Sequence, residues 1–319
     1  MNISVFNAIS DAIAFTKQLL IDQFSFSRWF FFGIAAFLAT LGENNISFSN
    51  FNFSSHQHNT SQFKQFVVEY LPVIIVIAAF IILFLLALSI LFVWLSSRGK
   101  FIFLDGIVRN QPDIIRPWHE FSTEGTSLFI FRLIVGFISL GIIVCIVGAI
   151  LIICLPIFHS EPFSSARIVL LLLCILLFLA FLMPLILFNS ILTDFIVPIM
   201  YRCRIGVLRA LVVFKDKILS GHVVDLIVFY VMKILLSIVI TICCVLITLL
   251  TCCACCMLVF PFLNMFVAAM IFLPFIMFMR CYSLFFLQQF GDDWFFIDMQ
   301  HGAYMPDSSC SAEIMPETI

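Results

Sequence analysis

The sequence predicts an all-α polytopic membrane protein with about six transmembrane helices. Of its 319 residues, 63% are hydrophobic and 11% are charged, and 41 are phenylalanine. Soluble domains carry about 25% charged residues, and a soluble fold of this length could not hide so much apolar surface. Long apolar runs along the chain provide the second observation. The net charge of −2 gives a nucleic-acid partner no electrostatic basis for binding.

Six segments are predicted to cross the bilayer, because each approaches the roughly 20 apolar residues that a spanning helix needs. They cover approximately residues 24–42, 71–95, 129–157, 168–193, 226–250 and 262–285. The first is the shortest, and Arg28 and Trp29 near its start are expected to lie at the interface. The last two share a charge-free run from Ile234 to Met279. That run would be about 69 Å long as a helix, enough for two crossings.

The remaining segments are amphipathic or polar. Residues 1–27 indicate either an interfacial amphipathic helix or a cytosolic lead-in. Residues 42–70 form an Asn/Ser-rich loop, and His56 and His58 within it are interpreted as solvated, because a metal site needs three or four ligands. We expect one membrane domain over residues 1–300, followed by a polar acidic tail over residues 301–319.

Basic residues are concentrated in two of the segments between spans. Segment 96–125 has four and segment 202–222 has five, whereas the alternate loops have two, Lys64 and Arg167. By the positive-inside rule, both basic segments and both termini face the cytoplasm. We expect the two segments to lie on the inner leaflet as amphipathic helices, with basic side chains toward anionic lipid headgroups. The expected headgroup contacts are Arg98, Lys100, Arg202, Arg204, Lys215 and Lys217.

The two basic segments also resemble each other in design. Each follows an even-numbered predicted span and leads into an odd-numbered one. This parallel suggests a two-fold internal repeat of span, cytoplasmic helix and span. The alternative is that short cytoplasmic loops are generally basic and amphipathic.

Several charged residues lie in or near the predicted spans. Arg132, Asp194 and Lys233 are candidates for an intramembrane polar path, because charges at membrane depth are costly and often mark pathways or pairs. The alternative, which we favour, is that these side chains lie at the membrane interface. Asp225 and Lys233 share a helical face but are about 12 Å apart, so we do not expect them to pair.

Six of the 12 cysteines cluster near the expected hairpin between the last two spans: Cys243, Cys244, Cys252, Cys253, Cys255 and Cys256. Such a cluster suggests a thiol redox pair or a soft-metal site. We favour small packing residues at a tight helical hairpin, because no histidine, acidic or basic residue lies nearby. The sequence also lacks the common catalytic motifs. We therefore expect no enzyme activity, cofactor or metal.

Four stretches carry a resemblance to known proteins: RGKFIFLDGIVRN, PWHEF, SLFIFRLIVG and LPFIMFMRCYSLFFLQQFG. With them, the chain resembles an uncharacterised family of bacterial multi-pass integral membrane proteins. That family is distantly similar to the membrane domain that accompanies some glycerophosphodiester phosphodiesterases. Because this chain has no catalytic phosphodiesterase domain, the resemblance implies no such activity, and it transfers no functional residue.

The sequence therefore predicts a non-enzymatic component of a bacterial inner membrane, involved in envelope organisation or associated with lipid. The alternative is a transporter or permease-like subunit whose path is lined by Arg132, Asp194 and Lys233.

Overall fold

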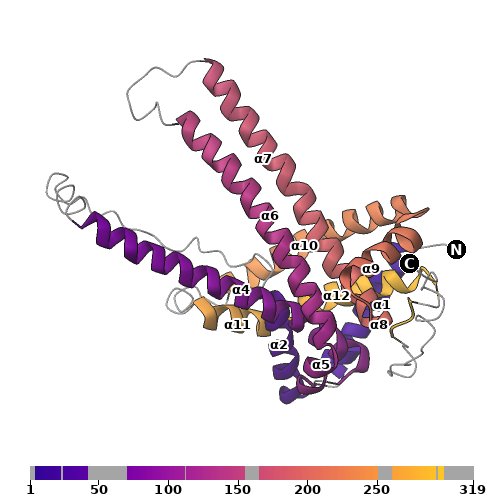
Figure 1. Ribbon diagram of the computed structural model, residues 1–319. Coiled ribbons are helices and arrows are strands. Elements are labelled where there is room, and N and C mark those ends of the chain that lie inside the picture. The colour runs from indigo at the N-terminus through magenta and orange to yellow at the C-terminus, as the bar shows by residue number, and fades with distance from the viewer. Residues whose placement is uncertain are drawn as a thin grey trace.

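The computed structural model consists of helices, with no strand among the residues that it describes (Figure 1). These are residues 4–22, 24–41, 70–111, 113–154, 165–250, 261–291 and 294–297. The α-helices are α1 (Val5–Lys17), α2 (Phe26–Thr40), α4 (Leu71–Arg109), α5 (Ile115–Glu120), α6 (Ser122–Cys154), α7 (Ser165–Ile191), α8 (Val197–Cys203), α9 (Val207–Val213), α10 (Val223–Leu250), α11 (Pro261–Ile271) and α12 (Leu273–Gln288). Short π-helical segments are η1 (Gln18–Asp22), η4 (Leu192–Ile196) and η5 (Phe214–Leu219).

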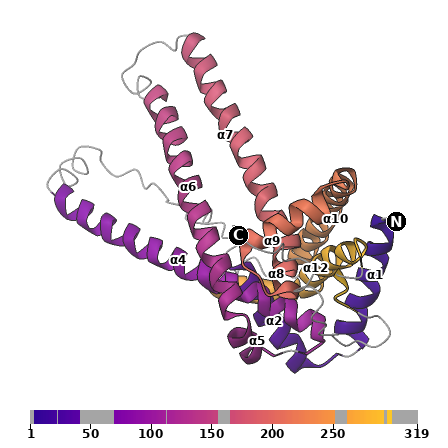
Figure 2. The same cartoon turned by 45° about the vertical axis from the view of Figure 1, so that its right-hand side comes forward.

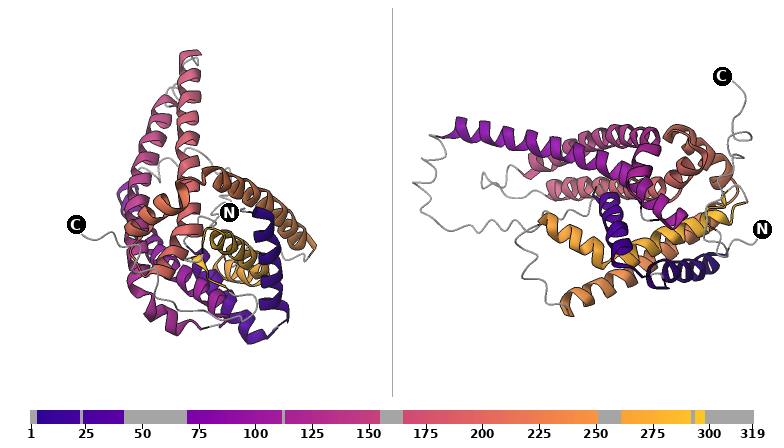
Figure 3. Two further views of the ribbon diagram at one scale, coloured as in Figure 1. Left: turned by 90° about the vertical axis from the view of Figure 1, so that its right-hand side faces the viewer. Right: turned by 90° about the horizontal axis from the view of Figure 1, so that it is seen from below.

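The molecule consists of a packed base and long helices that project from it. Figures 1 and 2 show α6 and α7 extending side by side while α4 diverges from them. We call the projecting parts the stems; they are residues 73–91 of α4, 130–152 of α6, 169–187 of α7 and 234–246 of α10. The base contains the other parts of these helices together with α1, α2, α5, α8, α9 and α12. Figure 3 (right) shows α4, α6 and α7 extending toward the same side of the base.

The stems expose apolar side chains on nearly every face. Phe80 of α4 is 70% exposed, and Leu172 of α7 is similarly uncovered. Because exposed apolar surface of this extent is unfavourable in water, hydrocarbon is the solvent that suits it. Four helical stretches are long and apolar enough to cross a membrane: Ile75–Arg109, Ser122–Ile153, Val169–Cys203 and Val223–Leu246. They match the second to fifth predicted spans and support the membrane class.

The first and sixth predicted spans are not confirmed as single spanning helices. Helix α2 has 15 residues, or about 22 Å, against a hydrocarbon thickness of about 30 Å. The segment predicted to span at 262–285 is divided at Phe272 into α11 and α12, of 11 and 16 residues. Pro274, in the first turn of α12, lacks the N–H that would continue the helix.

Helix α2 lies beside the base part of α4 and runs antiparallel to it. Arg28, near the start of α2, donates to the backbone oxygen of Asn110 at 3.3 Å. Near its end, the Ser96 hydroxyl donates to the Ala39 carbonyl at 2.9 Å. A Cβ at Gly99 would lie 2.5 Å from the carbonyl carbon of Leu38, so this approach requires glycine. Helix α2 therefore reaches only as far as the point where the α4 stem begins.

The first basic segment is not a surface helix. Helix α4 continues through Ser96 and ends at Arg109, and Asn110 caps it in the left-handed conformation with φ 52°. Every residue from Phe101 to Val108 is buried in the base. The expectation that this stretch lies along the inner leaflet is wrong, because helices of the same chain cover both of its faces.

Helix α1 is likewise covered by protein. Ala8 and Ala12 are fully buried, and the ring of Phe15 meets that of Phe285 on α12 edge-on at 5.8 Å. The apolar face predicted for an interfacial helix therefore packs on α12 instead of on lipid. At the start of α1, the Ser4 N–H donates to the Gln289 side chain at 2.7 Å, and Gln289 donates back to the Ser4 carbonyl at 3.0 Å. This reciprocal pair holds the first and last helices together in the base.

Aromatic rings join the later helices in the core. Phe229 of α10 stacks on Tyr282 and Phe286 of α12, with ring centroids 4.7 and 4.4 Å apart. Phe195 of η4 meets Phe229 edge-on at 5.3 Å. Such pairs contribute about 0.5–1.5 kcal/mol each beyond their area burial. They fix the positions of α10 and α12 against η4, where the predicted polar residue Asp194 lies.

Candidate functional site

A buried carboxylate, Asp105 of α4, is at the centre of the ion pairs in the base. It is 1% exposed. It accepts from Arg116 of α5 at 3.0 Å and from the hydroxyl of Tyr201 on α8 at 2.8 Å, and Arg109 Nε lies 2.8 Å from it. Three helices therefore meet at one carboxylate. A buried charge with this many donors is well compensated.

Glu120 extends these contacts, which together we call the Asp105 network. Arg109 donates to Glu120 at 3.1 Å, and Arg204 at the end of α8 forms a second ion pair with it. Arg204 also lies 3.7 Å from Glu124, and its guanidinium stands 3.8 Å over the ring of Phe121. Each arginine of the network thus faces a carboxylate of the same chain.

A second polar group surrounds η4. Asp194 is 3% exposed and forms an ion pair with Lys233 of α10. Ser190 completes the group, because it donates to Asp194 at 3.1 Å and accepts from Lys233 at 3.2 Å. The structure therefore brings together two of the three residues predicted for a polar path.

The neighbouring residue, Thr193, draws two more cations to η4. Lys100 of α4 donates to its hydroxyl at 2.6 Å, and Arg280 of α12 donates to its carbonyl at 2.8 Å. A π-helical turn inserts one residue into the regular helix and alters its carbonyl pairing, which suits a carbonyl that accepts from a side chain. Lys100 is 2% exposed, so the expectation that it contacts lipid headgroups is wrong.

Arg132, the third residue predicted for the path, contacts a different part of the base. It donates to the Ser96 hydroxyl at 3.3 Å, and that hydroxyl donates to Ala39 on α2. A path through all three residues stays a prediction.

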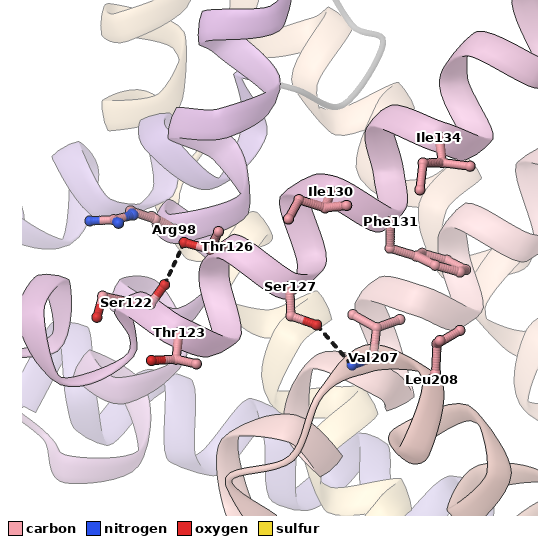
Figure 4. Close-up of a pocket in the computed structure, with 10 residues that line it drawn as sticks. All are labelled: Arg98, Ser122, Thr123, Thr126, Ser127, Ile130, Phe131, Ile134, Val207 and Leu208. Carbon is pink, nitrogen blue, oxygen red and sulfur yellow. Dashed lines mark hydrogen bonds between the residues drawn. The ribbon is translucent and has the colours of Figure 1, made fainter.

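A groove opens where α6 leaves the base (Figure 4). Its volume is about 660 Å³, and α4, α6 and α9 contribute its walls. It is lined by Arg98, Ser122, Thr123, Thr126, Ser127, Ile130, Phe131, Ile134, Val207 and Leu208. Figure 4 shows Arg98 at the same end as Ser122 and Thr126, with the isoleucines further along α6. One end of the groove is therefore polar and cationic, and the other is apolar.

Two tryptophans hold Arg98 in place. Its guanidinium carbon lies 4.9 Å from the ring centre of Trp94 and 5.1 Å from that of Trp118, in cation–π geometry. A Cβ at Gly125 would lie 3.0 Å from the Arg98 side chain, so a small residue on α6 admits it. Among the described residues, Arg98 has no acidic partner, and its buried Nε has no acceptor. The lack of an acid among these residues distinguishes Arg98 from the arginines of the Asp105 network, each of which faces a carboxylate.

The other residues predicted to contact headgroups lie near the end of α8 and on η5. Arg204 belongs to the Asp105 network, and Arg202 is half-buried. Lys215 and Lys217 are exposed on η5. Asp225 of α10 lies 3.0 Å from the ring nitrogen of His222.

Among the described residues, no group of three or more His, Cys, Asp or Glu side chains gathers as a metal site would require. Cys243 and Cys244 lie half-exposed on the α10 stem. His56, His58 and the cysteines at 252–256 lie outside the described residues, as does the predicted tail at 301–319.

Comparison with known proteins gives a family but no activity. The profile of a family of unknown function (DUF7544) matches residues 3–263, most of the chain. The chain belongs to this family. No curated protein and no solved structure matches it. The match covers α1 to α10 of this member, and therefore both the groove and the Asp194–Lys233 pair.

Sequence reasoning missed the groove, although a signal for it is present. The hydroxyl-rich stretch STEGTS at residues 122–127 comes directly before an apolar run. Its approach to Arg98 could not be foreseen, because it depends on how α4 packs against α6. Likewise, the sequence identified the charges of the Asp105 network but not their partners.

Proposed function

We propose that this member of the family is a non-catalytic, lipid-associated component of a bacterial inner membrane. The observation that carries the proposal is the outward face of α9 and η5. Leu208 and Val212 on that face are 69% and 58% exposed, and the basic residues Arg209 and Lys215 are exposed beside them. Exposed apolar side chains flanked by basic ones are typical of a helix in the interface of an anionic membrane.

The location of α9 supports the same interpretation. Its inner face, formed by Val207, Ala210 and Val213, is buried in the base. Leu208 lines the groove together with Ile134 of the α6 stem. Helix α9 therefore lies where a stem leaves the base, which is the depth expected for headgroups. The bias of basic residues toward this end of the molecule favours a cytoplasmic base.

The paired ends of the described chain support the proposed topology. Ser4 and Gln289 bond to each other in the base, so the start of α1 and the end of α12 lie on one side of the stems. With a cytoplasmic base, both ends face the cytoplasm. The proposed role is association with lipid.

Site-specific photo-crosslinking tests the proposal. The photoreactive residue p-benzoylphenylalanine is placed at Val212 in the protein reconstituted in native-lipid vesicles, and adducts are identified by mass spectrometry. We expect lipid adducts at Val212. The matched control is Ile115 on α5, which is also apolar and exposed but lies at the part of the base away from the stems (Figures 1 and 2). Absence of lipid adducts at Val212, or equal yields at both positions, would contradict the proposal.

A transporter is the second candidate, favoured by the Asp194–Lys233 pair. Buried charges at the end of spanning helices often belong to ion or proton relays, and π-helical turns are frequent at functional sites. In proteoliposomes, this alternative predicts a proton flux that Asp194→Asn abolishes and that the matched surface variant Asp216→Asn leaves unchanged. A flux no greater than that of empty vesicles would exclude proton transport.

A further inference from the structure

The groove at the start of α6 has the chemical pattern of an amphiphile. Ser122, Thr126, Ile130 and Ile134 follow one another at intervals of four residues, so they lie along one face of the helix. Over about 18 Å of helix, this face changes from hydroxyl to aliphatic. A soluble anion would need only the first half of that face. A lipid would use both halves.

The polar half of the groove contains a cation to which the described residues supply no counter-ion. The Arg98 guanidinium stacks with Trp94 and Trp118, and no acid among the described residues pairs with it. Glu124, the nearest carboxylate in sequence to the groove's hydroxyls, lies against Arg204 instead. A half-buried guanidinium is stabilised by an anion, and its planar fork matches the geometry of phosphate oxygens.

The hydroxyl groups near Arg98 can complete the coordination of such an anion. Thr126 donates to the Ser122 carbonyl at 2.7 Å, and Ser127 accepts from the Val207 N–H at 3.2 Å. These contacts fix the hydroxyl oxygens while leaving the Ser122 and Thr123 side chains to donate. The start of the 33-residue helix α6 also carries the positive end of its dipole, which favours a negative group.

The apolar half continues directly into the membrane-facing surface. Ile130, Ile134 and Leu208 are all exposed, and the α6 stem beyond them is apolar. An acyl chain lying along this face would cover these side chains and leave the headgroup at Arg98. We therefore propose that the groove is a specific site for one phospholipid, with its phosphate bound by Arg98 and hydroxyls at the start of α6. This rests on the proposed lipid association and narrows it to one stoichiometric ligand.

Native mass spectrometry of the full chain, delipidated in detergent and then titrated with phosphatidylglycerol, tests the proposal. We expect one saturable lipid per chain. Arg98→Gln should weaken that binding by about tenfold or more, because it removes a charge-assisted hydrogen-bond donor. Arg98→Lys should restore it in part, because a lysine keeps the charge without the fork. Lys17→Gln, which removes a positive charge from the exposed end of α1 outside the groove, should leave stoichiometric binding unchanged.

Two further measurements complete the test. One distinguishes a phospholipid from a free phosphate ester, and the other guards against a variant that loses binding because it misfolds. Glycerol phosphate alone should not compete at concentrations where the lipid saturates; equal competition would overturn a lipid site in favour of a soluble anion. Leu208→Gln, at the apolar end, should weaken lipid binding although it removes no phosphate contact. Unchanged lipid binding in both Arg98→Gln and Leu208→Gln would overturn the proposal that the groove is the lipid site. Lipid crosslinking at Val212 does not depend on the groove, so that outcome would leave the proposed lipid association intact and reject only the specific site.

Discussion

The base and the stems of this molecule use opposite means to satisfy their side chains. In the base, the protein itself supplies the partners: Asp105 meets two arginines and a tyrosine, and Phe101 is fully buried. In the stems, residues such as Phe80 are exposed, and the bilayer must supply the contacts. Helix α4 contains both environments along one continuous rod. A long apolar helix therefore need not face lipid over its whole length.

The largest expected effect concerns the charge at the centre of the base. Asp105→Ala should lower the free energy of unfolding by about 3–5 kcal/mol, because it leaves buried arginines without their carboxylate. Unfolding in mixed micelles with increasing denaturing detergent measures this. Asp216→Asn on exposed η5 is the control and should change little. A small loss at Asp105 would mean that water reaches the network and that the base is less closed than described.

A matched pair on α4 tests the two environments directly. Phe101→Ala should lower the free energy of unfolding by about 3–5 kcal/mol, because it opens a cavity in the packed base. Phe80→Ala on the stem removes no packed neighbour and should change it by about 0.5 kcal/mol or less. The same unfolding assay compares both. Equal losses would show that the stems also pack against protein, for example in an oligomer.

The Asp194–Lys233 pair lies at the boundary between base and stem. Asp194→Asn or Lys233→Met should each lower the free energy of unfolding by about 1–3 kcal/mol, because a buried partner is left unsatisfied. The double variant should lose less than the sum of the two single variants. A double-mutant cycle measures this coupling. Strict additivity would indicate that the two side chains do not interact in the membrane.

Two glycines, one in the base and one on a stem, give the last comparison. Gly99→Ala should lower stability by about 1–3 kcal/mol, because its Cβ would strike the backbone of α2 and overpack the base. Gly136→Ala on the α6 stem meets no atom within 4 Å and should be neutral or slightly stabilising, since alanine is the better helix former. Thermal unfolding followed by size-exclusion chromatography is sufficient to compare them. A tolerated alanine at position 99 would contradict the close approach of α2 to α4.

Sequence reasoning succeeded where a single segment carries the whole signal. The four long helices α4, α6, α7 and α10 were predicted because each apolar run alone exceeds the thickness of a bilayer. It did not foresee that α2, whose composition suits a span, packs beside the base part of α4. It also failed for Phe101–Val108, where helical spacing of apolar residues suggested a surface helix. In both cases the covering partner is distant in sequence, so local pattern could not reveal it.

The candidate sites divide in the same way. Asp194 and Lys233 were recognised as unusual because charge within an apolar run is visible in sequence. Their pairing was not foreseen, since 39 residues separate them. Lys100 was predicted to face lipid, and its contact with Thr193, 93 residues away, is a property of the packed helices. The cationic end of the groove depends equally on the contact between α4 and α6.

The sequence by itself determined that this protein is helical and suited to a membrane, because composition and run length decide which solvent a segment prefers. It also placed most basic residues in two segments, which sets their expected side of the bilayer. The packing of the helices decided which charged side chains have an oppositely charged partner among the described residues and which does not. Asp105 finds its partners where α4, α5 and α8 meet, whereas Arg98 lies between two tryptophans with no acid opposite it among the described residues. The partners of a buried side chain come from helices that are distant in sequence, so they depend on how the whole chain folds.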